Sequence, residues 1–102
     1  MRLLEKLYEL GLYVESEEEV KQFIAEHPEV IDDLAYVVEE LMKSIPRADY
    51  LLYVDGPLLI LNAQVHTYRD YTEILSLLPY LHPLTDFFQI EISVPSLKDE
   101  ID

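Results

Sequence analysis

The fold is decided by residues 50–67, which read YLLYVDGPLLILNAQVHT. Two runs rich in β-forming residues, 50–54 and 58–67, stand on either side of the turn-forming triplet Asp55–Pro57. Strand-like runs separated by so short a turn are typical of a β-hairpin. We therefore expect a hairpin at the centre of the chain, with helices before and after it.

Alternation of apolar and polar side chains gives each expected strand two faces. In the second hairpin strand, the apolar face consists of Leu59, Leu61, Ala63 and Val65. Residues 87–94 also alternate and predict a last strand, whose apolar face consists of Phe88, Ile90, Ile92 and Val94. If the two strands are neighbours, their polar positions share an uncovered face. This candidate ligand or partner face consists of Asn62, Gln64, His66, Gln89, Glu91 and Ser93.

Three helices are expected before the hairpin. Leucines at helical spacing predict the first over residues 3–10, with Gly11 as its stop. Ser16 and Glu19 form a capping-box pattern that predicts the start of the second helix. This second helix should end at His27, because a proline disfavours helical geometry in the residue before it.

The third helix is the longest expected element. Pro28 suits its first position, and Asp32 and Asp33 suit the positive end of its dipole. A broad apolar stripe continues through residues 30–45, and the helix should stop just before Pro46.

A fourth helix is expected between the hairpin and the last strand, with Thr67 as its N-cap and Pro79 at its end. Three helices, a hairpin, a helix and a strand predict an α+β fold. We expect a small, mainly antiparallel sheet with helices on one face. Residues 1–94 should form a single domain, and residues 95–102 should form a frayed acidic C-terminal tail.

Acidic residues dominate the charge of a chain that is half hydrophobic. Twenty-one aspartates and glutamates stand against seven lysines and arginines, and 50% of the 102 residues are hydrophobic. So much apolar material predicts a folded core and not a disordered acidic tail. The shortage of cations argues against nucleic-acid binding. The absence of cysteine excludes thiol catalysis and cysteine-bound metals.

The apolar segments are short. Charged residues interrupt the first fourteen positions, so no signal-peptide pattern is formed there. The longest apolar stretch, residues 50–65, is shorter than the roughly 20 residues of a membrane span and is broken by a turn. We expect a cytoplasmic protein that does not bind a membrane.

Three stretches of the chain carry a resemblance to known proteins: the His-Pro-Glu step at residues 27–29, residues 58–65 and residues 87–94. Over residues 28–94 the chain resembles small acidic bacterial proteins of unknown function, including cyanobacterial ones. The resemblance implies a helix opened by the His-Pro-Glu step, then a strand pair, a helix and a last strand. It brings no activity and no functional residue with it.

Acidic side chains gather around His27 and have the oxygen atoms that a metal site needs. The cluster consists of Glu26, Glu29, Asp32 and Asp33. Acidic residues in a first helical turn also stabilise the helix dipole, which explains the cluster without a metal. The same interpretation applies to residues 17–19. We therefore predict neither a metal site nor a cofactor.

His66 shares the expected polar face with Asn62 and Gln64, where it could hold a polar ligand or act as a general base. No serine is paired with it in a recognisable motif, and a chain with two glycines has no phosphate-binding loop. A loosely hydrogen-bonded histidine is the simpler interpretation, as it is for His82. No catalytic residue is predicted.

The composition favours a non-catalytic interaction or regulatory module. Negative charge would steer such a protein towards a basic partner. Two alternatives stay open. One is a ligand-binding protein or small enzyme that uses the face around His66. The other is a homodimer whose subunits meet at that same face.

Overall fold

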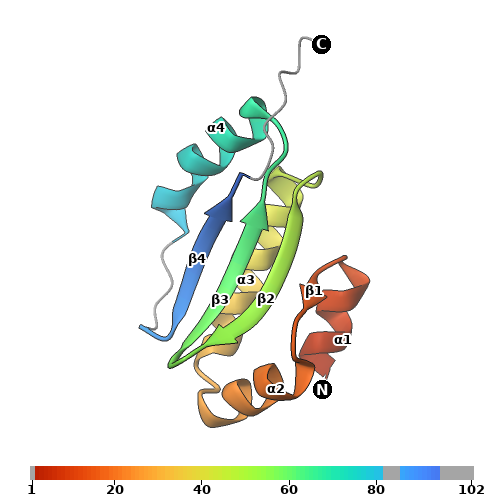
Figure 1. Ribbon diagram of the computed structural model, residues 1–102, viewed down its shortest axis with the longest axis vertical. Helices are drawn as coiled ribbons and strands as arrows, with labels where there is room; N and C mark the ends of the chain where they lie inside the picture. The colour runs from red at the N-terminus through yellow and green to blue at the C-terminus, as the bar shows by residue number, and fades with distance from the viewer. Residues whose placement is uncertain (1, 82–85, 95–102) are drawn as a thin grey trace.

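The computed structural model describes residues 2–81 and 86–94, and within them four strands form one sheet in the order β1-β2-β3-β4 (Figure 1). In chain order the elements are α1 (Arg2–Glu9), β1 (Tyr13–Val14), α2 (Glu17–Glu26), α3 (Val30–Ser44), β2 (Asp49–Asp55), β3 (Leu58–Gln64), α4 (Tyr68–Leu77), the 3-10 turn η1 (Leu78–Tyr80) and β4 (Phe88–Ser93). The α+β class and the β2–β3 hairpin are confirmed. However, β1 runs parallel to β2 and β4 runs parallel to β3. The expectation of a mainly antiparallel sheet is therefore wrong.

The helix between β3 and β4 decides the direction of the last strand. Thr67 caps α4 as predicted, because its side-chain oxygen accepts a hydrogen bond from the backbone N–H of Asp70 at 3.1 Å. The helix returns the chain towards the start of β3, where Leu59 pairs with Phe88. A connection that contains a helix can join parallel strands, whereas a tight turn joins antiparallel ones.

A two-residue strand, β1, was not predicted. Tyr13 and Val14 pair with Leu51 and Leu52, at the edge of the sheet next to β2. Gly11, with a φ of +97°, turns the chain between α1 and this strand. Two residues have no visible periodicity, so pairing with β2 alone defines β1.

Two prolines predict the ends of α2 and α3 to within one residue. The second helix, α2, ends at Glu26, ahead of Pro28, and α3 ends at Ser44, ahead of Pro46. The start of α3 is two residues later than predicted, at Val30. Both ends agree with the exclusion of helical geometry before a proline.

The predicted capping box at Ser16 is wrong. Ser16 precedes α2 with a left-handed backbone, at φ 54°, and its side chain makes no capping hydrogen bond. Its carbonyl instead accepts from the backbone N–H of Glu19 at 2.9 Å. A capping box needs the extended backbone that points the serine hydroxyl at the third helical residue, and Ser16 does not adopt it.

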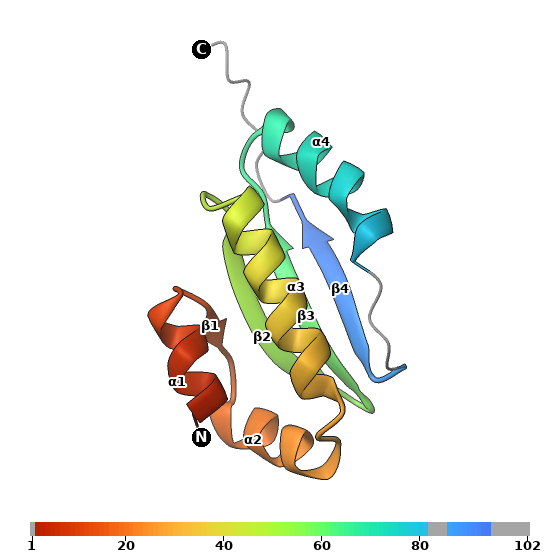
Figure 2. The same cartoon turned by 180° about the vertical axis from the view of Figure 1, so that it is seen from behind.

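One face of the sheet packs against α3, which crosses it in Figure 2. The strand residues on this covered face are mostly apolar and join the core: Val14, Tyr50, Leu52, Val54, Leu59, Leu61, Ala63, Phe88, Ile90 and Ile92. The hydroxyl of Tyr50 lies 2.7 Å from the carbonyl oxygen of Ile45 and 3.0 Å from that of Leu41, at the end of α3. Strand and helix are thus joined by apolar burial and by a buried hydrogen bond.

Some expectations fall outside the described residues, namely the frayed tail at 95–102 and the loop that holds His82. Within residues 2–81 and 86–94, no helix has both the length and the apolar character needed to cross a bilayer.

Candidate functional site

The face of the sheet turned away from α3 is the candidate site, and it is turned towards the viewer in Figure 1. We call it the open face. It consists of alternate strand residues and two residues that continue β1 and β3: Tyr13, Glu15, Asp49, Leu51, Tyr53, Asp55, Leu58, Ile60, Asn62, Gln64, His66, Gln89, Glu91 and Ser93. All six residues of the predicted candidate face belong to it, because β3 and β4 are neighbours.

A hydrogen-bond network joins three of those predicted residues. The Nδ2 of Asn62 donates to Glu91 Oε1 and to Ser93 Oγ, both at 2.8 Å. Tyr53 adds a fourth member from β2, because its hydroxyl donates to Glu91 Oε1 at 3.3 Å. Asn62 is 4% exposed, and its Oδ1 has no hydrogen-bond partner among the described residues. The network therefore contains a buried acceptor that is left unsatisfied.

The other predicted residues lie apart from this network. His66 Nε2 lies 2.7 Å from Asp49 Oδ2, a contact between the end of β3 and the start of β2. Gln64 is the register partner of both Asp49 and Ser93, and the exposed Gln89 is the register partner of Ile60. The six predicted residues thus share a face, but the hydrogen bonds described above join only Asn62, Glu91 and Ser93 to one another.

The Asp49–His66 pair does not by itself make a catalytic centre. A carboxylate can orient an imidazole for general-base work, but the base must also reach a nucleophile or a substrate proton. Within the described residues, no serine or threonine hydroxyl hydrogen-bonds to His66. The pair instead holds the Asp49 carboxylate at the rim of the open face.

Residues from β1 and β2 are the part of the site that sequence reasoning missed. Desolvation first, and then the charge and hydrogen bond of Glu91, raise the pKa of the Tyr53 phenol, with smaller effects from Asp55 and Glu15. The carboxylates whose charges act on this phenol come from three strands or strand ends. Alternation along β2 could have revealed Tyr53 and Asp55, but no sequence signal marks Glu15.

A hollow of about 340 Å³ lies on the open face at the β1–β2 edge. Its lining mixes two carboxylates with aromatic, apolar and amide side chains: Tyr13, Glu15, Asp49, Tyr50, Leu51 and Gln64. Its shape follows from the shortness of β1. The strand pairs only with Leu51 and Leu52, so the sheet edge beside Asp49 and Tyr50 is left without a partner strand.

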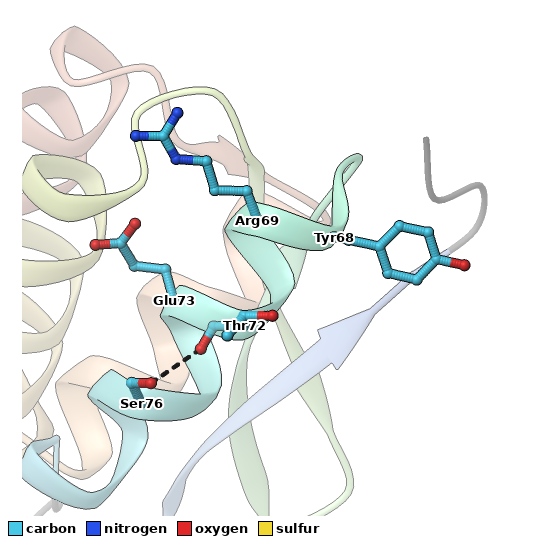
Figure 3. A pocket seen from close by; sticks show the side chains of 5 residues that line it. All are labelled: Tyr68, Arg69, Thr72, Glu73 and Ser76. Atoms are coloured by element: carbon cyan, nitrogen blue, oxygen red, sulfur yellow. Dashed lines mark hydrogen bonds between the residues drawn. The ribbon is translucent and has the colours of Figure 1, made fainter. Parts of the chain in front are cut away.

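Another hollow, of about 500 Å³, lies on α4 and is shown in Figure 3. Its lining comes from one helix: Tyr68, Arg69, Thr72, Glu73 and Ser76. Tyr68 points to one side while Arg69 and Glu73 point to the other. Ser76 uses its hydroxyl within the helix, donating to the carbonyl oxygen of Thr72 at 3.1 Å. Side chains that diverge do not converge on a ligand, so this hollow is a weaker candidate despite its size.

The acidic cluster around His27 is explained by packing. The His27 ring stacks on Phe87, with centroids 4.4 Å apart, and lies tilted against Phe23 at 4.8 Å. Its Nδ1 lies 3.7 Å from Glu29 Oε1. The acidic run before it includes Glu17, which pairs with Lys21 at 3.2 Å. Nowhere in the described part of the chain do three histidine, aspartate or glutamate side chains come together as a metal site would require.

No protein-family model, curated protein or solved structure matches this chain. The function is therefore inferred from the residues of the open face.

Proposed function

We propose that this protein is a non-catalytic interaction module that binds a basic protein partner through its open face. The distribution of charge supports the proposal. The carboxylates of Glu15, Asp49, Asp55 and Glu91 belong to this face, and the described strands contribute no lysine or arginine to it. The described cations lie on helices or in the α3–β2 loop: Arg2, Lys6, Lys21, Lys43, Arg47 and Arg69.

Three carboxylates on the helices, those of Glu17, Glu18 and Asp70, have cationic neighbours. Glu17 pairs with Lys21 at 3.2 Å, and Asp70 lies 3.9 Å from Arg47. Between described residues of the open face, the ionic contact is that of Asp49 with His66. A partner that brings lysine or arginine side chains would therefore meet carboxylates whose charge is not already balanced nearby.

The open face also offers contact area. Tyr13 is 69% exposed, and Leu51 and Tyr53 are half-buried. Partly solvent-exposed tyrosines are common in protein interfaces, because they supply apolar area together with a hydrogen-bonding group. Charge would steer the partner, and these side chains would supply the close contact.

A second copy of the chain suits the face less well than a basic partner. Two-fold pairing brings the same patch of both copies together. The carboxylates of one open face would then approach those of the other, and among the described residues of each face the one basic side chain is that of His66. Like charges placed opposite each other oppose association.

Binding of defined peptides tests the proposal. A short arginine- and lysine-rich peptide should bind the protein and shift amide signals on β2, β3 and β4 in a two-dimensional NMR titration. An acidic peptide of the same length should not bind. Added salt should weaken the complex, because the charges involved are exposed.

Matched variants decide where the peptide binds. Asp55→Asn with Glu91→Gln should weaken binding about tenfold. Glu18→Gln with Asp32→Asn removes the same total charge from helix surfaces and should weaken binding less than about twofold. Equal losses in the two variants would mean unspecific attraction and overturn the proposal. A dimer by light scattering that only the open-face variant dissociates would establish self-association instead.

A further inference from the structure

We propose that the hollow at the β1–β2 edge of the open face binds an arginine side chain of the partner. This inference rests on the proposed function and narrows it to one site and one side chain. The hollow is lined by Tyr13, Glu15, Asp49, Leu51 and Gln64, together with Tyr50 beneath it.

The lining matches the two parts of an arginine side chain. Leu51 supplies an apolar surface for the methylene groups, and the exposed ring of Tyr13 offers a face on which a guanidinium can stack. The carboxylates of Glu15 and Asp49 and the amide oxygen of Gln64 are acceptors for its N–H groups. A flat guanidinium with five donors can serve several acceptors around a hollow, whereas an ammonium is a compact charge with three donors.

The two carboxylates are available for this contact. Glu15 forms no ion pair with a lysine or arginine among residues 2–81 and 86–94. Asp49 meets His66 through Oδ2 and keeps a side chain that is 74% exposed. Contact with His66 restrains the Asp49 carboxylate before the ligand arrives, which lowers the entropic cost of binding.

Asn62 lies beside the hollow and does not belong to its lining. It pairs in register with Leu51, a lining residue of the hollow. Its Nδ2 donates to Glu91 and Ser93 on β4. The Oδ1 is buried and has no partner among the described residues. A buried acceptor without a donor is costly, so the open face holds an unsatisfied acceptor close to Leu51, against which the arginine would pack.

The residues that line the hollow argue against other classes of ligand. Carboxylates repel phosphate and other anions, and the hollow has no lysine or arginine to offset them. A metal site is not formed by its lining, since no three metal-binding side chains group together in the described residues. A large hollow with an aromatic wall suits a long organic cation better than a small inorganic ion.

Blocked single amino acids test the site with no other contacts present. Nα-acetyl-arginine amide should shift the amide signals of Tyr13, Asp49 and Leu51 in a saturable NMR titration. Nα-acetyl-citrulline amide has nearly the same shape without the charge and should produce no saturable shift. Nα-acetyl-lysine amide should bind at least about threefold more weakly than the arginine compound.

Variants then separate this site from general attraction. Glu15→Gln should weaken arginine binding about tenfold. Glu18→Gln removes an equal charge from the exposed surface of α2 and should leave it within about twofold of the original. Equal effects of the two variants, or shifts that map away from the β1–β2 edge, would overturn the site. If the basic peptide still binds the open face in that case, only the arginine site fails. If that peptide does not bind, the proposed function fails.

Discussion

Leu61 and Asn62 are neighbours on β3, and both are buried, but they face opposite sides of the sheet. Leu61 is 0% exposed and belongs to the apolar cluster under α3. Asn62 is 4% exposed and belongs to the hydrogen-bond network of the open face. A helix buries the first residue, whereas polar neighbours on the strands crowd the second. Equal burial on the two faces therefore has different causes.

The two faces differ most in how their polar groups are satisfied. On the covered face, the hydroxyl of Tyr50 reaches two carbonyl oxygens of α3. On the open face, Asn62 Oδ1 has no partner among the described residues, and Glu15 has no cationic neighbour there. Buried groups without partners are uncommon in folded proteins. The named polar groups of the covered face are thus satisfied within the protein, whereas those of the open face leave an acceptor and a carboxylate for the proposed partner.

The largest expected effect comes from removing apolar volume from the covered face. Leu61→Ala should lower the free energy of unfolding by about 3 kcal/mol, because it leaves a cavity between the sheet and α3. Leu51→Ala, on the half-buried open face, should cost about 1 kcal/mol. Urea unfolding followed by circular dichroism measures both. Equal losses would show that the open face is packed as tightly as the core.

A smaller loss is expected from the buried phenol. Tyr50→Phe should cost about 1–2 kcal/mol, because the carbonyl oxygens of Ile45 and Leu41 lose a buried donor. Tyr53→Phe removes a longer contact with Glu91 on the open face and should cost less than about 0.5 kcal/mol. The same unfolding experiment compares the pair. A costlier Tyr53 variant would contradict the contrast between the faces.

Alkaline pH should also separate Tyr50 from exposed tyrosines. Burial first, and then the negative charge of Asp70, raise the pKa of Tyr50 well above 10.0. The unfolded chain therefore loses this proton at a lower pH than the folded chain does. Its contribution to stability is complete below about pH 10 and should decline above it, by roughly 1.4 kcal/mol per pH unit. Unfolding free energies measured across that range should fall less steeply for Tyr50→Phe than for Tyr36→Phe. Identical slopes for the two variants would contradict a raised pKa of Tyr50 in the folded protein.

A still smaller effect is expected for the buried amide of the open face. Asn62→Leu should change the free energy of unfolding by less than about 1 kcal/mol. The substitution removes an unsatisfied acceptor, and the exposed Glu91 and half-buried Ser93 can bond to water instead. Thermal and urea unfolding would show whether stability is kept. A loss above about 2 kcal/mol would mean that the network is structural and would weaken its link to a ligand.

The smallest expected effect concerns charge as a whole. A formal net charge of −14 on 102 residues produces self-repulsion, which salt screens. Raising salt to physiological strength at neutral pH should therefore increase the melting temperature by a few degrees. Differential scanning calorimetry is the measurement. A melting temperature that stays flat or falls with salt would show that attractive ion pairs outweigh repulsion.

Local signals predicted much of the fold. The turn triplet Asp55–Pro57 placed the hairpin, Thr67 placed the cap of α4, and Pro46 placed the end of α3. These features depend on a few adjacent residues, so the sequence displays them directly. The prediction of a cap at Ser16 was wrong because the backbone conformation of Ser16 depends on how the chain leaves β1. No local sequence pattern indicates that conformation.

The candidate site was predicted only in part. Alternation on residues 58–66 and 87–94 identified the polar face, because side chains on a strand alternate regardless of their neighbours. It did not identify the β1–β2 hollow, which Tyr13, Glu15 and Asp49 line together. These residues are far apart in the chain, and a strand of two residues has no period to detect.

The sequence by itself determined which segments fold, which faces of the strands are apolar, and that the chain is strongly acidic. Periodicity and capping are local, and charge depends only on composition. The tertiary structure alone decided the direction of β4, the presence of β1 and the hydrogen bond of Tyr53 to Glu91. Each of these depends on pairing between distant segments. The open face became a specific candidate for a basic partner only once that pairing was known.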